Sequence, residues 1–294
     1  MAKGTSPKRM AVFSTRCRPR GKCSLQTRPR AFHGLSRIDF HGSISTDQGA
    51  VHRKFLINPW QIRVAVAFRS RLKDSRLWTG YNSSMIHEIL PVGLLQCNCS
   101  IIGDEATREA MVIDPGDEIE DVVALVRKHN LQVKQIVITH AHIDHVGGAM
   151  KLRAATGAPI LLNQNDYALL KMLDVQAAWI GVPAPGKVEI DRSVTTGETV
   201  SAGCHTAQVL HTPGHTEGSI CLYFEPAKKL VAGDTLFAGS IGRTDLPGGD
   251  PQKIMRSLHD TVLALPDDTV VIPGHGKLTT IGEEREGNPF LVKR

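Results

Sequence analysis

The sequence predicts an α/β protein in which helices cover a pair of packed β-sheets. From residue 85 onward, short apolar runs typical of strands alternate with segments whose apolar residues recur every three or four positions. The second half of this region is richer in strand-like runs than in helical ones, which places its helices on the outside of packed sheets. Residues 85–294 are therefore predicted to form one domain, which is long enough to bury a hydrophobic core of its own.

Residues 1–84 differ from the rest of the chain in charge. Residues 1–85 hold 17 Lys and Arg against 3 Asp and Glu, whereas residues 86–294 hold 18 against 26. The net charge of +6 averages two unlike parts, so it does not indicate that the folded part binds nucleic acid. High net charge with little apolar content predicts that residues 1–84 form a disordered extension.

Three interpretations of this extension stay open. We favour an over-extended reading frame whose true start is Met85, directly before the first clear strand, which implies a cytoplasmic protein. An Arg-rich, acid-poor segment is also typical of a mitochondrial or plastid transit peptide. A basic tail that binds nucleic acid is the third interpretation and the least favoured. The sequence contains no run of about 18 apolar residues, so no membrane span is predicted.

The first half of the domain contains five predicted strands and three predicted helices. Asp117 and Asn165 are placed where they can cap helices, and Gly157 is a typical helix end. Cys97 and Cys99 lie on one strand face and are expected to be small buried residues, which fits a reducing compartment. The strands are predicted at residues 86–90, 95–103, 109–114, 135–138 and 158–162, and the helices at 119–126, 145–156 and 165–180.

The second half contains mainly strands. Pro251 suits the first turn of a helix and therefore marks where one begins. The strands are predicted at residues 199–200, 206–210, 219–224, 229–232 and 269–272, the helix at 251–265, and a terminal helical turn at 282–290.

Three histidines and a carboxylate lie within six residues, directly after the predicted strand 135–138. In an extended segment His140 and His142 point to the same side, so they can hold one ion together. Asp144 and His145 follow one turn later and suit a second ion beside the first. Imidazole and carboxylate ligands without thiolate fit zinc, manganese or iron.

Three further candidate ligands also follow predicted strands. His215, Asp234 and His275 each come directly after a glycine, which lets the backbone turn sharply and approach an ion closely. Together with the first cluster they give seven ligands, the number and type expected for two ions that share Asp234. His205 and His211 match no ligand position and are expected to be structural or solvated.

In this order, the stretches Thr-His-Ala-His-Ile-Asp-His, Thr-Pro-Gly-His-Thr, Gly-Asp-Thr and Pro-Gly-His-Gly resemble the metallo-β-lactamase superfamily, over about residues 86–290. The resemblance implies an αββα four-layer sandwich (α/β, or α+β in some schemes) with the metals at one edge of the two sheets. It implies that His140, His142 and His215 bind one metal. Asp144, His145 and His275 would bind the other, with Asp234 as the bridge. Two divalent ions are expected, zinc first and iron or manganese as alternatives.

Residues 239–245 resemble the glyoxalase II-like (hydroxyacylglutathione hydrolase-like) branch. Only residues 276–294 follow the last ligand, so the C-terminal region that holds glutathione in that branch is missing. We therefore expect hydrolysis of small acyl thioesters by a hydroxide shared between two metals, with glutathione thioesters in question. Asp144 and Asp234 would be catalytic. Arg243 is expected to bind a substrate carboxylate, or else to pair with Asp245 or solvent.

Three other functions are weighed against thioester hydrolysis. A mononuclear iron persulfide dioxygenase of the same superfamily would use His140, His215 and Asp234 as a facial triad. A β-lactamase is a minor hypothesis, because true β-lactamases lack the bridging aspartate that the resemblance assigns to Asp234. Nucleic-acid binding through residues 1–84 is the non-enzymatic alternative.

Overall fold

The computed structural model describes residues 84–292. The predicted extension, its three interpretations and its boundary with the domain depend on residues outside this part of the chain and stay predictions. Among the described residues, no helix has both the length and the apolar character needed to cross a membrane.

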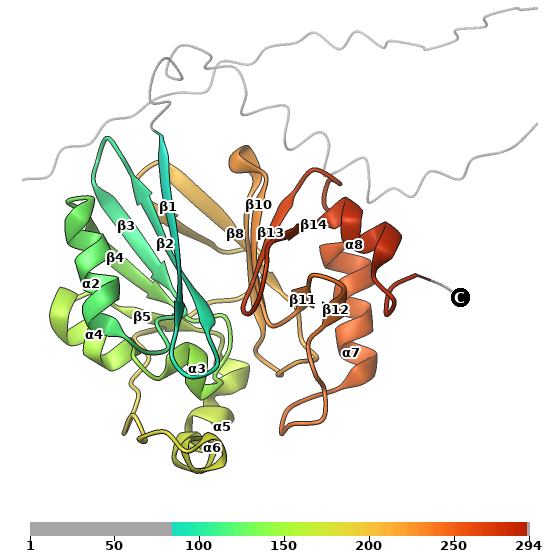
Figure 1. The fold of residues 1–294 in the computed structure, drawn as a ribbon, viewed down its shortest axis with the longest axis horizontal. Helices are drawn as coiled ribbons and strands as arrows, with labels where there is room; N and C mark the ends of the chain where they lie inside the picture. Colours follow the sequence, from blue (N-terminus) through green and yellow to red (C-terminus); the bar gives the residue numbers. More distant parts are fainter. Residues whose placement is uncertain (1–83, 293–294) are drawn as a thin grey trace, which may run out of the picture. The chain divides into compact units, whose positions relative to one another are not determined.

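The first sheet is formed by the N-terminal half of the domain (Figure 1). Its six strands lie in chain order: β1 antiparallel to β2, β2 antiparallel to β3, and β3 to β6 parallel. The strands are β1 (Met85–Val92), β2 (Cys97–Asp104), β3 (Glu109–Ile113), β4 (Gln132–Val137), β5 (Ile160–Leu162) and β6 (Arg192–Ser193).

The second sheet is formed by the C-terminal half, in the order β14-β13-β10-β9-β8-β7. Only β10 and β13 run parallel; the other neighbours are antiparallel. A separate hairpin joins β11 (Leu236–Phe237) and β12 (Ser240–Ile241). The sheet strands are β7 (Thr199–Ala202), β8 (His205–His211), β9 (Ile220–Phe224), β10 (Lys229–Gly233), β13 (Val270–Pro273) and β14 (Thr279–Thr280).

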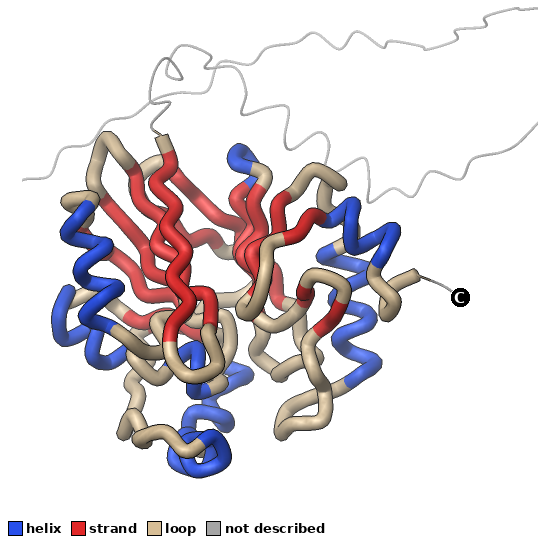
Figure 2. The backbone as a smooth tube through the Cα atoms, viewed as in Figure 1, coloured by secondary structure: helices blue, strands red, loops and turns tan. Residues whose placement is uncertain are grey.

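Helices cover the outer face of each sheet (Figures 1 and 2). The first sheet carries α2 (Ile119–Lys128) and α4 (Ala149–Thr156), and the second carries α7 (Pro251–Arg256) and α8 (Ile281–Gly287). A π-helical turn, Ser257–Val262, extends α7. At one end of the sheets lie α3 (Ile143–Val146), α5 (Tyr167–Leu170) and α6 (Leu173–Ile180), after the 3₁₀ turn Gln164–Asp166; a second such turn is Glu225–Ala227.

Three apolar layers separate these four layers of secondary structure. Neighbouring strand residues point to opposite faces, so Ile101 packs under the helices of the first sheet while Ile102 packs between the sheets. The third layer joins α7 and α8 to the second sheet, for example through Ile254 and Val271. Because both faces of each sheet are covered, strands such as β3 and β9 are almost wholly buried. The predicted αββα sandwich is confirmed.

Predicted helices are interrupted where the backbone packs closely. The predicted helix 145–156 is two helices, α3 and α4, separated by Gly147 and Gly148. A Cβ on Gly148 would lie 2.5 Å from both the Pro115 carbonyl oxygen and the Ile119 side chain, so this turn contacts the loop before α2. The predicted helix 165–180 is likewise divided into a 3₁₀ turn, α5 and α6, and 251–265 into α7 and a π-helical turn.

Local capping differs from prediction at two positions. The Asn163 side chain, rather than Asn165, accepts the hydrogen bond of a cap, from the Asn165 N–H. Asp117 accepts from the Glu118 N–H before α2 begins and makes no cap inside the helix. Gly157 does end α4, with a φ of 73°. Cys97 and Cys99 are buried free thiols, as predicted.

Candidate metal centre

The loops that carry the seven predicted ligands meet at one end of the two sheets. His140 and His142 follow β4 of the first sheet, and α3 carries the next two ligands (Figure 1). His215, Asp234 and His275 follow β8, β10 and β13 of the second sheet. The structure therefore brings together side chains from both sheets, within a few ångströms of one another.

Three histidines form the first cluster. Nδ1 of His142 lies 3.0 Å from Nε2 of His140 and 2.9 Å from Nε2 of His215. All three side chains are buried. This is the group that the sequence assigns to the first metal.

Asp144, His145 and His275 form the second cluster. Nε2 of His275 lies 3.1 Å from Oδ2 of Asp144 and 3.3 Å from Nε2 of His145. Nε2 of His145 lies 3.6 Å from the same Asp144 oxygen. These three side chains are the group that the sequence assigns to the second metal.

Asp234 lies between the clusters. Its Oδ2 is 3.5 Å from Nε2 of His215 in the first cluster and 3.6 Å from Nε2 of His275 in the second. Its Oδ1 is buried and accepts no hydrogen bond, although Nε2 of His145 is 3.4 Å away. A buried carboxylate oxygen without a hydrogen bond is costly unless a cation satisfies it. Asp234 therefore fits the predicted bridging position.

Gly274 allows the close approach of these groups. A Cβ at this position would lie 2.0 Å from Oδ1 of Asp234 and 2.8 Å from Cε1 of His145. The glycine before His275 is thus required by the space that the two clusters occupy.

Hydrogen bonds fix the tautomers of His140 and His145. Thr139 donates its hydroxyl hydrogen to Oδ2 of Asp114, so its oxygen accepts from Nδ1 of His140, 3.1 Å away. Nδ1 of His145 donates to the same Asp114 oxygen over 3.0 Å. In the neutral form of each ring the lone pair is therefore on Nε2, which faces the clusters. Burial works against charge on His145, but Cys97 and the surrounding aspartates raise its pKa well above the usual value.

Backbone carbonyls fix two further histidines in the same way. Nδ1 of His215 donates to the carbonyl oxygen of Arg243 at 2.8 Å, and Nδ1 of His275 donates to that of Leu95 at 2.9 Å. A carbonyl oxygen can only accept, so Nε2 of each neutral ring carries a lone pair. In the first cluster, three ring nitrogens thus converge with at most one proton among them, on His142. Such an arrangement fits a cation.

The pKa values of the first cluster agree with this donor set. Burial, with the neighbouring histidines, lowers the pKa of His140 well below its usual value and that of His142 to about 3, so both rings are in the neutral form that binds metals. Burial works against charge on His275, but its hydrogen bond with Asp144 and the charge of Asp234 raise its pKa. The second cluster therefore favours positive charge.

Cys97 borders the second cluster without joining its donor set. Its Sγ lies 3.4 Å from Nδ1 of His145, and burial raises the pKa of its thiol to about 12. Without a bound metal the buried thiol therefore stays protonated.

Two aspartates support the site and were not among the predicted residues. In the sequence, Asp114 stands only as the last residue of the predicted strand 109–114. Asp166 accepts hydrogen bonds from the Ala141 N–H (2.9 Å), the Thr216 hydroxyl (2.8 Å) and the Gly218 N–H (2.6 Å), and so joins the two loops that carry the histidines of the first cluster. The position of Asp114 at a strand end was the available signal; no local signal marks Asp166.

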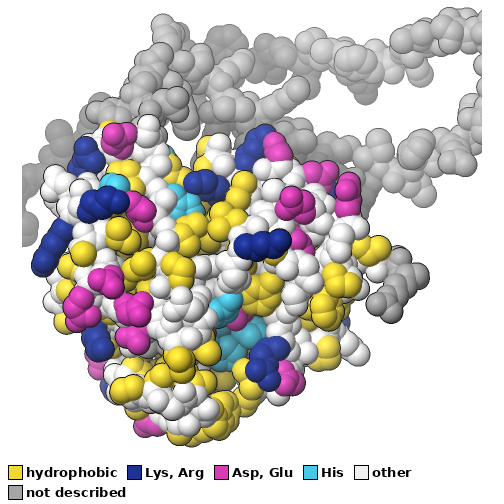
Figure 3. All heavy atoms as spheres, viewed as in Figure 1, with side chains coloured by type: hydrophobic (Ala, Val, Ile, Leu, Met, Phe, Trp, Pro, Cys, Tyr) yellow, Lys and Arg dark blue, Asp and Glu magenta, His cyan; other side chains and the backbone are white. Residues whose placement is uncertain are grey.

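A cavity of about 410 Å³ opens over the clusters and is lined by His142, Asp144, His215 and Asp234. Figure 3 shows histidine side chains at the surface among hydrophobic ones. Arg243 also lines this cavity, and its guanidinium makes two hydrogen bonds to Asp245 at 2.8 and 2.7 Å. Arg243 was expected either to bind a substrate carboxylate or to pair with Asp245 or solvent, and in this structure it pairs with Asp245.

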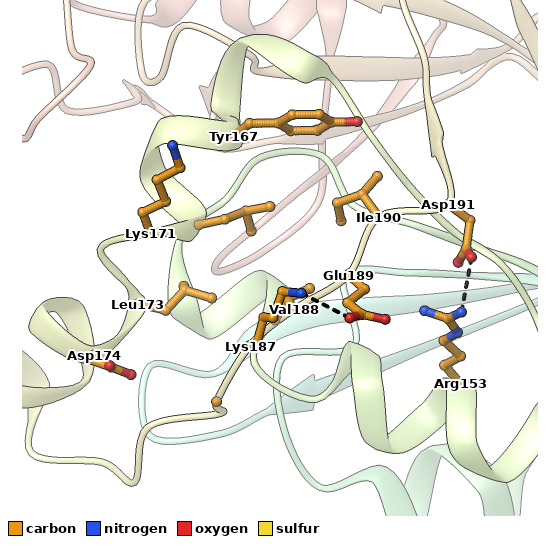
Figure 4. A pocket seen from close by; sticks show the side chains of 12 residues that line it. Arg153, Tyr167, Lys171, Leu173, Asp174, Lys187, Val188, Glu189, Ile190 and Asp191 are labelled. Carbon is orange, nitrogen blue, oxygen red and sulfur yellow. Dashed lines mark hydrogen bonds and ion pairs between the residues drawn. The ribbon is translucent and has the colours of Figure 1, made fainter.

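A larger cavity, of about 730 Å³, lies elsewhere and contains none of the predicted site residues. Its charged side chains pair with one another, Arg153 with Asp191 at 3.0 Å and Lys187 with Glu189 at 3.1 Å (Figure 4). His211, which was expected to be structural or solvated, donates a hydrogen bond from Nε2 to the Glu217 carbonyl oxygen.

The fold and the convergent His and Asp side chains define a metallo-hydrolase. Residues 92–275 match the model of the Metallo-beta-lactamase superfamily, and the chain belongs to that family. Hydroxyacylglutathione hydrolase GloC of Haemophilus influenzae is 40% identical over 69% of this chain and 97% of its own length. Probable metallo-hydrolase YqgX of Bacillus subtilis is 33% identical over 69% of this chain and 95% of its own.

Solved structures with the same fold include three informative neighbours. BLEG-1, described as a B3 metallo-beta-lactamase, has a TM-score of 0.67 and 35% identity, covering 71% of this chain and all of its own. TTHA1623 in a di-iron-bound form has a TM-score of 0.64 and 39% identity, with 69% and 100% coverage. ETHE1 from Myxococcus xanthus has a TM-score of 0.59 and 31% identity, with 70% and 84% coverage.

Proposed function

We propose that this metal-dependent hydrolase cleaves acyl thioesters and belongs to the glyoxalase II-like branch of its superfamily. The observation that carries the proposal is the position of Asp234 between two clusters whose ring lone pairs converge. The similarity to a hydroxyacylglutathione hydrolase over nearly the full length of that relative supports thioesters as the substrate class. The proposed ligands are His140, His142 and His215 for one ion, Asp144, His145 and His275 for the other, and Asp234 for both.

Bound divalent ions supply a water of lowered pKa and polarise the thioester carbonyl. Asp144 lines the cavity. Burial alone would raise the pKa of its carboxyl, but the neighbouring His145 and His275 have the larger effect and lower it. Its ionised carboxylate can accept a hydrogen bond from the attacking water and so orient it. Burial would also raise the pKa of Asp234, but the neighbouring histidines lower it, so this carboxylate is ionised as well.

Arg243 is proposed to bind a carboxylate of the substrate at the rim of the cavity. Its side chain is 60% exposed and already holds the Asp245 carboxylate through two hydrogen bonds. A planar guanidinium binds carboxylates in this bidentate way, so a substrate carboxylate would exchange with Asp245.

Zinc is the first metal to test, because imidazole and carboxylate donors suit it. Iron has the support of the di-iron-bound neighbour, and manganese accepts the same donors.

The function is tested by loading the full chain with zinc, iron or manganese and following thiol release from a panel of acyl thioesters, lactoyl-glutathione included. We expect release that a chelator abolishes. Asp234→Ala should lower kcat/KM by at least about a thousandfold and reduce the bound metal, because both clusters lose a shared ligand. Asp117→Ala, an exposed aspartate outside the clusters, is the control. Metal-loaded protein that releases no thiol would overturn the proposal.

A persulfide dioxygenase is the second candidate, supported by the ETHE1 neighbour and by the proximity of Asp234 to His215. It would hold one iron through His140, His215 and Asp234. One tightly bound iron per chain and oxygen consumption with a persulfide would favour it over hydrolysis. A β-lactam belongs in the same panel, because BLEG-1 is described as a β-lactamase.

A further inference from the structure

The cavity over the metal clusters is apolar everywhere except at the clusters and two other polar side chains. The apolar part of its wall comes from four separate segments: the β1–β2 loop, α3, the α5–α6 region and the loop before α7. The apolar side chains that matter most here are Leu95, Leu169, Met172, Trp179, Leu246 and Pro247.

The two other polar side chains, Gln176 and Arg243, are already engaged. Gln176 is buried; its Oε1 accepts from the Ile143 N–H, and its Nε2 donates to the carbonyl oxygens of Ala141 and Leu169. The Arg243 guanidinium is occupied by Asp245 and lies largely in solvent. Among the described lining residues, the inner wall thus offers hydrogen bonds to a substrate only at the clusters.

The mouth of the cavity carries apolar side chains that remain exposed. Trp179 is 56% exposed on α6, and Leu95 is 45% exposed on the β1–β2 loop. The loop is tied to the site, since the Leu95 carbonyl accepts the hydrogen bond from His275. Exposed apolar area beside a reactive centre gains stability when an apolar ligand covers it.

The two halves of a thioester differ in how they fit this wall. The carbonyl must lie at the clusters, so one half extends along the apolar wall and the other extends toward the rim. A thiol half with carboxylates would lose hydration against the wall without replacement hydrogen bonds, whereas a hydrocarbon acyl chain would not.

We propose that this site selects thioesters with an apolar acyl group of about four to eight carbons over acetyl and hydroxyacyl thioesters, with Trp179 and Met172 as specificity-determining residues. This inference rests on the proposed thioester hydrolysis. Each methylene removed from water contributes a factor of about three to four to binding, so selectivity should grow with chain length until the cavity is full.

The test uses the full metal-loaded chain and thioesters of a single neutral thiol, N-acetylcysteamine, with acetyl, lactoyl, butanoyl, hexanoyl and octanoyl groups. We expect kcat/KM to rise about threefold per methylene from acetyl to hexanoyl, about 80-fold in total, and lactoyl to fall below butanoyl. Trp179→Ala and Met172→Ala should lower the hexanoyl value about tenfold and leave acetyl within about twofold.

Val175→Ala is the matched control, because Val175 is 46% exposed on the same helix and lies outside the cavity wall. It should keep the chain-length profile. Hydrolysis with a flat profile, or with lactoyl preferred, would overturn this inference and leave the proposed function intact. No hydrolysis of any thioester would overturn the proposed function instead.

A binding measurement tests the cavity without turnover. Calorimetry should show that octanoate binds the metal-loaded protein at least tenfold more tightly than acetate, and that Trp179→Ala removes the difference. Equal affinities for the two carboxylates would contradict an apolar acyl site even if the enzyme proved to catalyse another reaction.

Discussion

Asp114 determines the protonation of two histidines from outside the clusters. It is buried and accepts three hydrogen bonds: from the Thr139 N–H, from the Thr139 hydroxyl and from Nδ1 of His145. Through Thr139 it also directs the Nδ1 proton of His140. Carboxylates in this position commonly tune metal affinity, because they orient the ligand ring and raise its basicity.

Asp114→Asn is expected to weaken metal binding without unfolding the protein. The amide NH₂ cannot accept, so His145 loses its acceptor or turns its proton toward the second cluster. We expect the metal affinity of that cluster to fall about 10- to 100-fold, measured by competition with a chromogenic chelator. Asp117→Asn, in the same turn but exposed, is the control. Unchanged affinity in the Asp114 variant would contradict this role.

The seven candidate ligands could be chosen from the sequence because they stand in short motifs after apolar strands and those motifs resemble the metallo-β-lactamase superfamily, and the structure brings their side chains together. The supporting residues could not, since their partners are distant in the chain. Asp114 is 25 residues from Thr139, and Asp166 is 50 residues from Thr216. Only the packed loops define those contacts.

At the scale of elements, long strands and amphipathic helices were predictable and short ones were not. Each central strand shows its own apolar pattern. The two-residue strands, such as Arg192–Ser193 and Thr279–Thr280, exist only because a neighbouring strand pairs with them. The break between α3 and α4 also depends on tertiary packing, because Gly148 lies against the Pro115 carbonyl.

His87 makes the contact between the two sheets sensitive to pH. It lies on β1, where Nδ1 accepts a hydrogen bond from Nζ of Lys229 on β10 at 3.1 Å. Nε2 then donates to the Ser100 hydroxyl, 3.3 Å away on β2. Burial first, and the charge of Lys229 second, lower the pKa of His87 from 6.5 to about 4.

This shift predicts a loss of stability in acid. The unfolded chain binds a proton at His87 near pH 6.5, whereas the folded chain does so only near pH 4. Stability is therefore complete above pH 6.5 and falls as the pH drops from 6.5 toward 4, by about 2 kcal/mol at pH 4.5 once partial exposure is allowed for. Denaturant unfolding of metal-free protein should show an acid loss that is about 2 kcal/mol smaller in His87→Gln than in the native chain. His140 and His142, whose pKa values are also lowered, contribute equally to the loss in both proteins. Parallel losses in both proteins would refute it.

At the scale of the whole molecule, the candidate metal centre joins the two sheets. The first sheet supplies His140, His142 and the two candidate ligands of α3, and the second sheet supplies the other three candidates. Between the sheets lies an apolar layer, but at the site the two halves meet through imidazoles and carboxylates. Without a cation, the ring lone pairs of the first cluster face one another there.

Metal removal is therefore expected to lower the stability of the whole domain rather than loosen one loop. A ligand that binds only the folded state adds about 4 kcal/mol when its free concentration is a thousandfold above Kd. For a domain of this size that corresponds to a rise in Tm of about 10 °C. Calorimetry at increasing free zinc should show a single transition whose midpoint rises with concentration, and Asp234→Ala should flatten the dependence because both clusters lose a ligand. If bound metal left the midpoint unchanged, the ions would have to bind the unfolded chain equally well. The two sheets would then be held together by their apolar layer alone.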